Sequence, residues 1–298
     1  MSVYSTSLKQ VVFEARQFSQ RRCEFRLDRD AMYFSNLRLV GLGCAATGGA
    51  DLYNKMAGAY TVINRITLLD GAQELGRLDE ANRYLAWYNQ LDKNENNKYV
   101  NQRLAKHSIG YRLNDVEEEV ESGNSVDKSV LQLADPRVAK DEEEKSGWLD
   151  LRKVFPILNA LGALDASMMP NLRIVIEWEQ DARKILVTDT TRAVTIYQPV
   201  LVADEIVDDS MKAGLRANMK DVSYKSYEHD VFVIPEGTRS ADQTDTNGVV
   251  QSVSETINGF DNKYLHRVVL MKSYVDLGNS LGNGTAANPQ NPNRSMGG

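Results

Sequence analysis

The sequence has few of the residues on which catalytic and metal sites depend. Its 298 residues include three histidines and two cysteines. The histidines, His107, His229 and His266, are far from one another, and no cysteine lies at metal-ligand spacing from them. No Gly-x-Ser-x-Gly element and no phosphate-binding loop is present. We therefore predict that the protein is not an enzyme and that it has no catalytic, cofactor-binding or metal-ligating residues.

Long apolar runs are also missing. No segment approaches the roughly 20 apolar residues that a membrane-spanning helix needs, and the first 20 residues lack the apolar centre of a signal peptide. Cys23 and Cys44 are too few for a disulfide framework, and each lies in or beside a strand-like stretch. We expect buried free thiols and a reducing cytosol, with one disulfide between neighbouring strands as the alternative.

The balance of charge is acidic. The net charge of -6 and the pI of about 5.3 make the surface repel phosphate backbones, so we predict no direct, sequence-specific nucleic-acid binding. Much of the acid lies in residues 114–147, which we interpret as a long solvated loop. Calcium binding is disfavoured there because the Asp-x-Asp-x-Asp-Gly spacing is absent.

A glycine-rich stretch follows the first strand-like segments. Residues 41–46 match a dinucleotide-binding fingerprint only loosely, because no helix pattern follows them. Residues 46–50 are small and lack the Gly-Lys-Ser/Thr ending of a phosphate loop. We interpret this region as the end of a strand that enters a flexible loop.

Alternating apolar and polar residues predict strands in the first third of the chain. Residues 23–27 and 34–42 alternate at period two and are separated by a turn at 28–30. Residues 60–69 are rich in β-branched side chains and run into Asp70-Gly71, which predicts a hairpin with a type I′ turn. A helix of period three to four is expected next, over 78–91, with Asp79 and Glu80 in its first turn.

Further strand patterns occupy the second half of the chain. Residues 171–179 alternate clearly, residues 184–187 are a plausible partner strand, and 208–219 predict a short helix. Pro199 interrupts a strand at 195–206 and favours an edge or a bulge over a central position. With strands at 222–235 and 264–275 and a loop-like end at 278–298, the roughly ten strands predict an all-β sandwich.

The order of three segments resembles a known family. They are the hairpin at 69–74 that enters a helix, the stretch from 149 to 170 that leads into strand 172–176, and the strand that ends at 201–206. Together they resemble the major capsid proteins of the double jelly-roll lineage of icosahedral DNA viruses, especially those of Polinton-like viruses and virophages. The likeness covers about 25–206 and continues more weakly to 275.

This resemblance implies a double jelly roll with a few short helices in its loops. The expected parts are an N-terminal arm at 1–22, a first roll at 23–207, and a linker with the opening strands of a second roll at 208–298. Two complete rolls need about sixteen strands, which the chain does not supply. The rolls are then compact, or the sequence is part of a longer protein, or the chain is a single-roll minor or vertex capsid protein.

The resemblance also implies partners and a location. Three copies form a pseudo-hexagonal capsomer, which contacts neighbouring capsomers and minor capsid proteins in the virion shell after synthesis in the host cytoplasm. The N-terminal arm, with Lys9, Arg16, Arg21 and Arg22, is expected on the inner side, near an internal membrane or a minor protein.

A carbohydrate-binding β-sandwich is the alternative from another class. Trp87, Trp148 and Trp178 are its candidate residues, because aromatic rings stack on sugars. Packing against the sheets explains Trp87 and Trp178 equally well, so the assembly state and glycan binding separate the two hypotheses.

Overall fold

The computed structural model describes residues 8–28, 30–46, 51–52, 58–91, 138–139, 147–185, 193–218, 224–227 and 268. The chain divides into two units, of which the first comprises Met1–Ser226 with Met271–Gly298 and the second Tyr227–Leu270. All helices and strands described below belong to the first unit.

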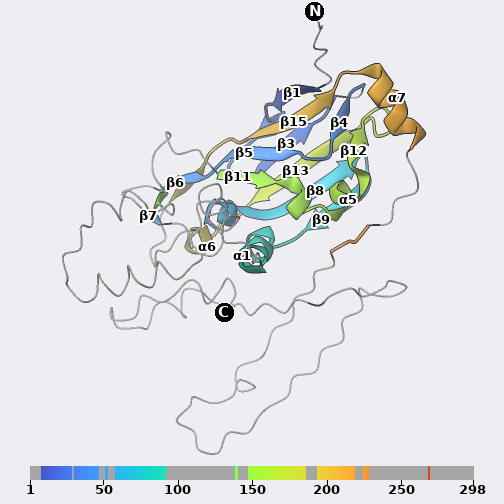
Figure 1. The fold of residues 1–298 in the computed structure, drawn as a ribbon. Helices are drawn as coiled ribbons and strands as arrows, with labels where there is room; N and C mark the ends of the chain where they lie inside the picture. The colour runs from blue at the N-terminus through green and yellow to red at the C-terminus, as the bar shows by residue number, and fades with distance from the viewer. Residues whose placement is uncertain are drawn as a thin grey trace, which may run out of the picture. The chain divides into compact units, whose positions relative to one another are not determined.

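One antiparallel sheet, called the first sheet, joins strands from distant parts of the sequence (Figure 1). The last strand of this sheet along the chain lies next to the first. On its other side lies a central strand that is divided into two segments, and each segment pairs with one further short strand. In spatial order the members are β1 (Leu8–Phe13), β15 (Val200–Ile206), β4 (Met32–Phe34) with β5 (Arg38–Leu42), and then β12 (Ala163–Asp165) beside β4 and β11 (Gly147–Asp150) beside β5.

The second sheet is also antiparallel throughout, and its central strand is β13 (Leu172–Trp178). In order it contains β2 (Gln17–Phe18), β3 (Arg22–Arg26), β13, β8 (Ile63–Asp70) and β9 (Gln73–Leu78). Two further pairs of short strands are β6 (Cys44–Ala46) with β14 (Val194–Ile196) and β7 (Asp51–Leu52) with β10 (Val138–Ala139).

This connectivity is that of a jelly roll. When the eight strand positions are lettered B to I along the chain, they are β1, β3, β4 with β5, β8, β9, β11 with β12, β13 and β15. The first sheet then has the order B-I-D-G and the second C-H-E-F, which is the arrangement of a double-sheet jelly roll. The predicted all-β jelly-roll class is therefore confirmed, with one complete roll between Leu8 and Ile206.

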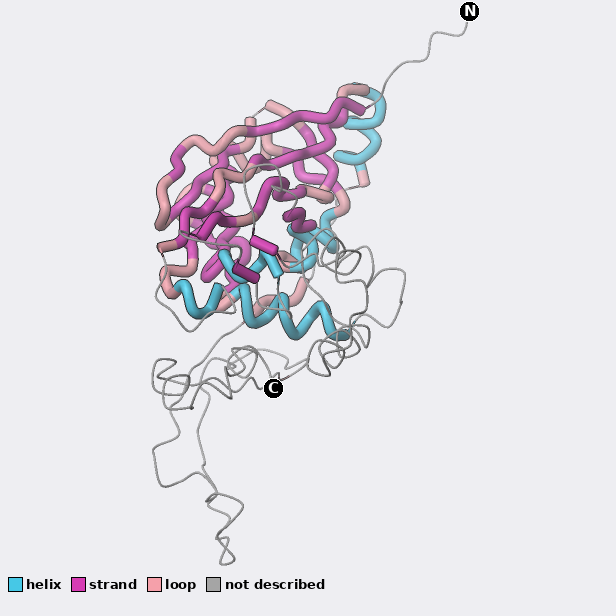
Figure 2. Tube along the Cα trace, turned by 90° about the vertical axis from the view of Figure 1, so that its left-hand side faces the viewer, coloured by secondary structure: helices cyan, strands magenta, loops and turns pink. Residues whose placement is uncertain are grey.

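The core of the roll lies between the two sheets and forms because alternate residues of each strand are apolar. Leu39, Leu149 and Leu201 lie opposite one another on the inner face of the first sheet and are 0% exposed. From the second sheet, Phe25 and Ile174 are equally buried. Figure 2 shows the strands gathered together, with the helices at the ends of this region.

Short helices close the ends of the roll. The helix α7 (Asp209–Ala217) follows β15 directly, and the Asp208 carboxylate caps its first turn by accepting a hydrogen bond from Met211 N at 2.9 Å. Met211 and Leu215 pack on a cluster of Met32, Ala163 and Ile206. The remaining short helices are η1 (Gly58–Val62), α1 (Ala81–Leu91), η3 (Leu151–Lys153), α5 (Pro156–Leu161) and α6 (Ala182–Ile185).

The structure corrects the expectation of an N-terminal arm at 1–22. Leu8–Phe13 form β1 and pair with β15 over six residues, and Gln17–Phe18 form β2. The edge position expected for strand 195–206 is also wrong, because β15 lies between β1 and β5. Pro199 immediately precedes that strand, so its missing N–H interrupts no ladder bond.

Four local predictions also change. Residues 60–62 belong to η1, and residues 184–185 of the predicted strand 184–187 belong to α6, while 186–187 lie outside the described residues. Asp79 and Glu80 precede α1 instead of lying in its first turn. The hairpin is confirmed, but its two loop residues are Gly71 and Ala72, and only Gly71 has a positive φ, at 59°, which fits a type II′ turn and not type I′.

Several predictions fall outside the described residues. Apart from β10 and Gly147, the long acidic loop at 114–147 is not described, and the expected strands at 222–235 and 264–275 are described only at 224–227 and 268. The second roll therefore stays a prediction, as do the domain boundaries that depend on it.

Candidate assembly surface

The outer face of the second sheet is covered by charged side chains. Arg65 forms ion pairs with Asp79 and Glu177, and Arg77 Nε lies 2.8 Å from Asp79 Oδ2. Burial alone would raise the pKa of Asp79, but the hydrogen bonds from Arg77 and Arg65 outweigh it and hold this pKa below its usual value. The carboxylate therefore stays ionised at neutral pH.

The same pattern continues on β3 and β13. Glu24 Oε2 lies 3.0 Å from Arg22 Nη2, and Glu24 Oε1 lies 3.7 Å from Arg173 Nη1. Partly exposed pairs of this kind contribute little stability in water, but covering them with another protein would remove their hydration at a considerable cost. The outer face of the second sheet is therefore suited to contact with solvent.

The outer face of the first sheet is different, because apolar side chains cross it from strand to strand. Val12 of β1 lies opposite Val202 of β15. Val200 of β15 lies opposite Val40 of β5, which in turn lies opposite Trp148 of β11. Directly opposite residues of antiparallel strands share a face, and the inner face is the one that contains Leu201. We call these five outward-facing residues the apolar row.

Exposure varies along the apolar row. Val12 is 57% exposed and Val202 is 9% exposed, while Val40, Val200 and Trp148 are half-buried. Beside the row, Arg38 Nη2 donates to Asp204 Oδ1 at 2.8 Å and Asn36 Nδ2 donates to Asp204 Oδ2 at 2.8 Å. These bonds fix the split central strand against β15. The first sheet thus presents an apolar surface on a rigid support, the arrangement that protein contacts favour.

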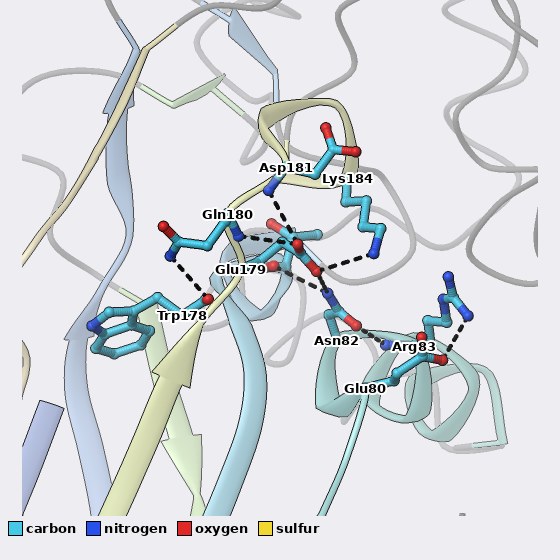
Figure 3. A network of polar contacts seen from close by, with 9 residues as sticks. Glu80, Asn82, Arg83, Trp178, Glu179, Gln180, Asp181 and Lys184 are labelled. Atoms are coloured by element: carbon cyan, nitrogen blue, oxygen red, sulfur yellow. Dashed lines mark hydrogen bonds and ion pairs between the residues drawn. The ribbon is translucent and has the colours of Figure 1, made fainter. Parts of the chain in front are cut away.

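A buried carboxylate, Glu179, organises the end of β13 (Figure 3). Glu179 is 7% exposed, and its Oε1 accepts hydrogen bonds from the backbone N–H groups of Gln180 at 3.0 Å and Asp181 at 3.1 Å. Its Oε2 accepts a bond from Asn82 Nδ2 at 3.2 Å and lies 3.6 Å from Lys184 Nζ. Because these partners come from α1 and α6, the carboxylate ties three elements together, and we interpret its role as structural.

No metal site is found in the described ranges, where no group of three or more His, Cys, Asp or Glu residues is placed to hold an ion. The three histidines lie outside the described residues. Residues 41–46 form the end of β5 and the strand β6, so the predicted strand is confirmed. Most of the loop expected after it lies outside the described residues. No helix in the described part of the chain is long and apolar enough to cross a membrane.

The candidate sugar-stacking residues are not brought together. Trp178 is 2% exposed and packs in the core, whereas Trp148 belongs to the apolar row. The structure does not describe the side chain of Trp87. A buried indole has no face available to a sugar, so the structure does not favour the carbohydrate-binding alternative.

Both cysteines are buried and free, as the sequence analysis predicted, and the alternative of a disulfide is wrong. Burial, with a smaller contribution from the charge of Glu24, raises the pKa of the Cys23 thiol to about 12. Cys23 therefore has the properties of a core residue and not of a nucleophile.

The sequence signal for the apolar row was incomplete. Val200 and Val202 lie in a predicted strand, but the partners that complete the row are far away in the sequence and become neighbours only through strand pairing. The strand β1 was not predicted, because the polar residues around it are typical of an extended N-terminal arm. The short run of β-branched and aromatic residues at 11–13 was the available signal.

Comparison with known proteins supplies no family assignment. No family model matches the chain, and no curated protein matches it. Among solved structures, "PBCV-1 virus capsid, quasi-atomic model" is similar at 10% identity and a TM-score of 0.41, over 72% of this chain and 46% of that chain. "Crystal structure of PBCV-1 VP54 fitted into a cryo-EM reconstruction of the virophage Sputnik" is similar at 9% identity and a TM-score of 0.39, over 74% and 47%.

The chain thus spans less than half the length of either solved chain. At these TM-scores the assignment of the fold continues to rest on the B-I-D-G and C-H-E-F strand order.

Proposed function

We propose that the protein is a structural coat subunit that self-assembles, as trimers, into the icosahedral capsid of a DNA virus. The observation that best supports this proposal is the contrast between the two outer faces of the jelly roll. One face is an array of paired charges, and the other presents the apolar row. A subunit that must be soluble alone and adhesive in a shell needs both kinds of surface.

Burial of the apolar face would stabilise the trimer. Apolar surface removed from water contributes about 25 cal/mol per Å², and a rigid sandwich loses little conformational freedom when it associates. In this proposal the apolar row lies against a roll of another copy. The charged face remains in contact with solvent or with neighbouring capsomers.

The remaining partners and parts belong to the same proposal. Residues 208–298 are a linker and the opening strands of a second roll, and α7 fixes the direction in which the chain leaves the first roll. The capsomers contact minor capsid proteins, and an internal membrane lies on the inner side of the shell. The protein is located in the virion shell and has no enzymatic role.

Light scattering of the purified chain tests the proposal. We expect a stable species with the mass of three 33.4 kDa chains at neutral pH and moderate salt, and electron microscopy of co-expressed material to show shells. The variant Val40→Lys places a charge in the apolar row and should dissociate the trimer. Met168→Lys, at a 67% exposed position outside the row, is the matched control. A monomeric wild-type protein would contradict the proposal.

A single-roll minor or vertex capsid protein is a second candidate function. It is favoured by the observation that Leu8 to Ile206 already close one complete roll. The two roles differ in what the chain builds by itself. A major coat protein forms shells or capsomer sheets when expressed with its accessory proteins, whereas a minor protein joins particles only when a separate major protein is supplied.

A further inference from the structure

A strand at the edge of a sheet exposes unpaired backbone groups, and proteins usually protect such edges by shortening, bulging or charging them. Three of the four edges described in this roll are protected. At the ends of the second sheet, β2 has two residues, and β9 bears Glu74 and Arg77 and pairs through a register shift at Leu68/Leu69. At the far side of the first sheet, β11 has four residues with a register shift, and β12 has three.

The fourth edge, β1, has none of these protections. It pairs with β15 over six consecutive residues without a register shift, and within the described residues β15 is its one partner strand (Figure 1). Its outward-facing side chains include Leu8, 41% exposed, and Val12, 57% exposed. Lys9 is the single charged residue among the six. The edge is therefore long, regular and largely uncharged, which is the form that recruits another strand.

We propose that β1 pairs antiparallel with β1 of a second copy of this chain, so that the first sheets of the two copies join into one continuous sheet. The inference rests on the proposed function to the extent that a coat protein brings many copies of itself together. A second copy is the occupant that the edge itself favours, because the strand is complementary to itself across a two-fold axis.

The sequence of β1 selects the register of this pairing. With the two-fold axis at Gln10, Leu8 of each copy lies opposite Val12 of the other and shares its face, so the most exposed apolar side chains of the edge cover each other. The two Gln10 amides are then opposite and can bond to each other. An axis at Lys9 would place two ammonium groups opposite one another, and an axis at Val11 would place Leu8 opposite the exposed Glu14.

Cross-linking at the axis tests the register directly. In Gln10→Cys the two introduced thiols face each other across the axis, so a short bis-maleimide should link two copies into a covalent dimer on a denaturing gel. Cys23 and Cys44 are buried and should not react in the folded protein. Met168→Cys is the matched control, because the position is more exposed yet lies outside the edge. Absence of the dimer in Gln10→Cys, with the control also unlinked and circular dichroism unchanged, would overturn the inference.

A second variant tests the contact without added thiols. Gln10→Lys places two ammonium groups opposite one another at the axis and lies outside the apolar row, so we expect light scattering to show that trimers remain while larger species joined through β1 are lost. Met168→Lys should keep the wild-type mass. If wild-type trimers form but neither variant at β1 changes or links them, the inference fails and the coat function stands. If Gln10→Cys gives covalent dimers while no trimer or shell forms, the inference stands and the coat function fails.

Discussion

Ile174 offers the sharpest test of the packing that holds the two sheets together. It lies in the middle of β13, opposite Phe25 of β3 on one side and Leu68 of β8 on the other, and all three are 0% exposed. Ile174→Ala removes three carbon atoms. At about 0.8 kcal/mol per buried carbon the transfer loss alone is about 2.4 kcal/mol, and the cavity that remains brings the total to about 3–4 kcal/mol.

Urea unfolding followed by circular dichroism measures this loss. For a slope of roughly 2–3 kcal/mol per M, the midpoint of Ile174→Ala should fall by about 1–2 M with an unchanged slope. Ile174→Val, which removes one carbon, should lose about 1 kcal/mol, and the exposed control Met168→Ala less than about 0.5 kcal/mol. All variants must be compared at one protein concentration, because association raises the apparent stability.

A loss of stability in Ile174→Ala no larger than that in Met168→Ala would refute the reasoning. If Met168→Ala and Ile174→Ala lowered the midpoint equally, the inward direction of Ile174 and the alternation assigned to β13 would both be wrong. If Ile174→Ala changed the slope as well, the variant would have altered the compactness of the unfolded or folded state, and the energy could not be assigned to the core.

Three further predictions concern a turn, a carboxylate and a thiol. Gly71 has a φ of 59°, so Gly71→Ala should lower the free energy of unfolding by about 1–2 kcal/mol. Gly214→Ala, in the exposed face of α7, should instead raise it by about 0.5–1 kcal/mol. Both changes are read from urea midpoints, and equal effects of the two variants would contradict the turn assignment. The hydrogen bond from Arg216 holds the pKa of Asp165 below its usual value, and bonds from Ser167 act in the same direction against the opposing effect of burial. The stability that Asp165 contributes is thus present above its unfolded pKa of about 3.9 and is lost as the pH falls through the lower folded pKa. Asp165→Asn should therefore flatten the acid end of a plot of urea midpoint against pH, and a wild-type profile in this variant would contradict the assignment. With the pKa of Cys23 raised to about 12, the thiol should not react with an aromatic disulfide reagent at pH 8 until urea unfolds the chain, and prompt reaction of the native protein would show that Cys23 is accessible.

Local patterns allowed much of the fold to be predicted from the sequence. Period-two alternation identified β3, β5 and β13, and Asp70-Gly71 after a β-branched run identified the hairpin of β8 and β9. Each of these signals lies within a few consecutive residues, where the side chains that decide the structure are neighbours in the chain.

Other elements depend on distant partners and were therefore missed or misplaced. β1 is half exposed and becomes a strand through its pairing with β15. Lys184 and Ile185, the first residues of the predicted strand 184–187, instead end a helical turn that contacts η1. The apolar row could not be predicted either, because its members come from four strands. Whether an apolar residue faces the core or the outside of a sheet depends on the register, which a single sequence does not specify.

The pairing of β1 with β15 also determines when this protein can finish folding. Leu8 lies opposite Ile206, so the first strand of the roll has no lasting partner until the last one has left the ribosome. The hairpin of β8 and β9 can form early, since its strands are adjacent in sequence, but contacts as distant as those of β1 are slow to form. During synthesis both sides of β1 are open, and such unpaired strands are prone to aggregate. β1 is therefore the strand of the roll that waits longest for its partner during synthesis.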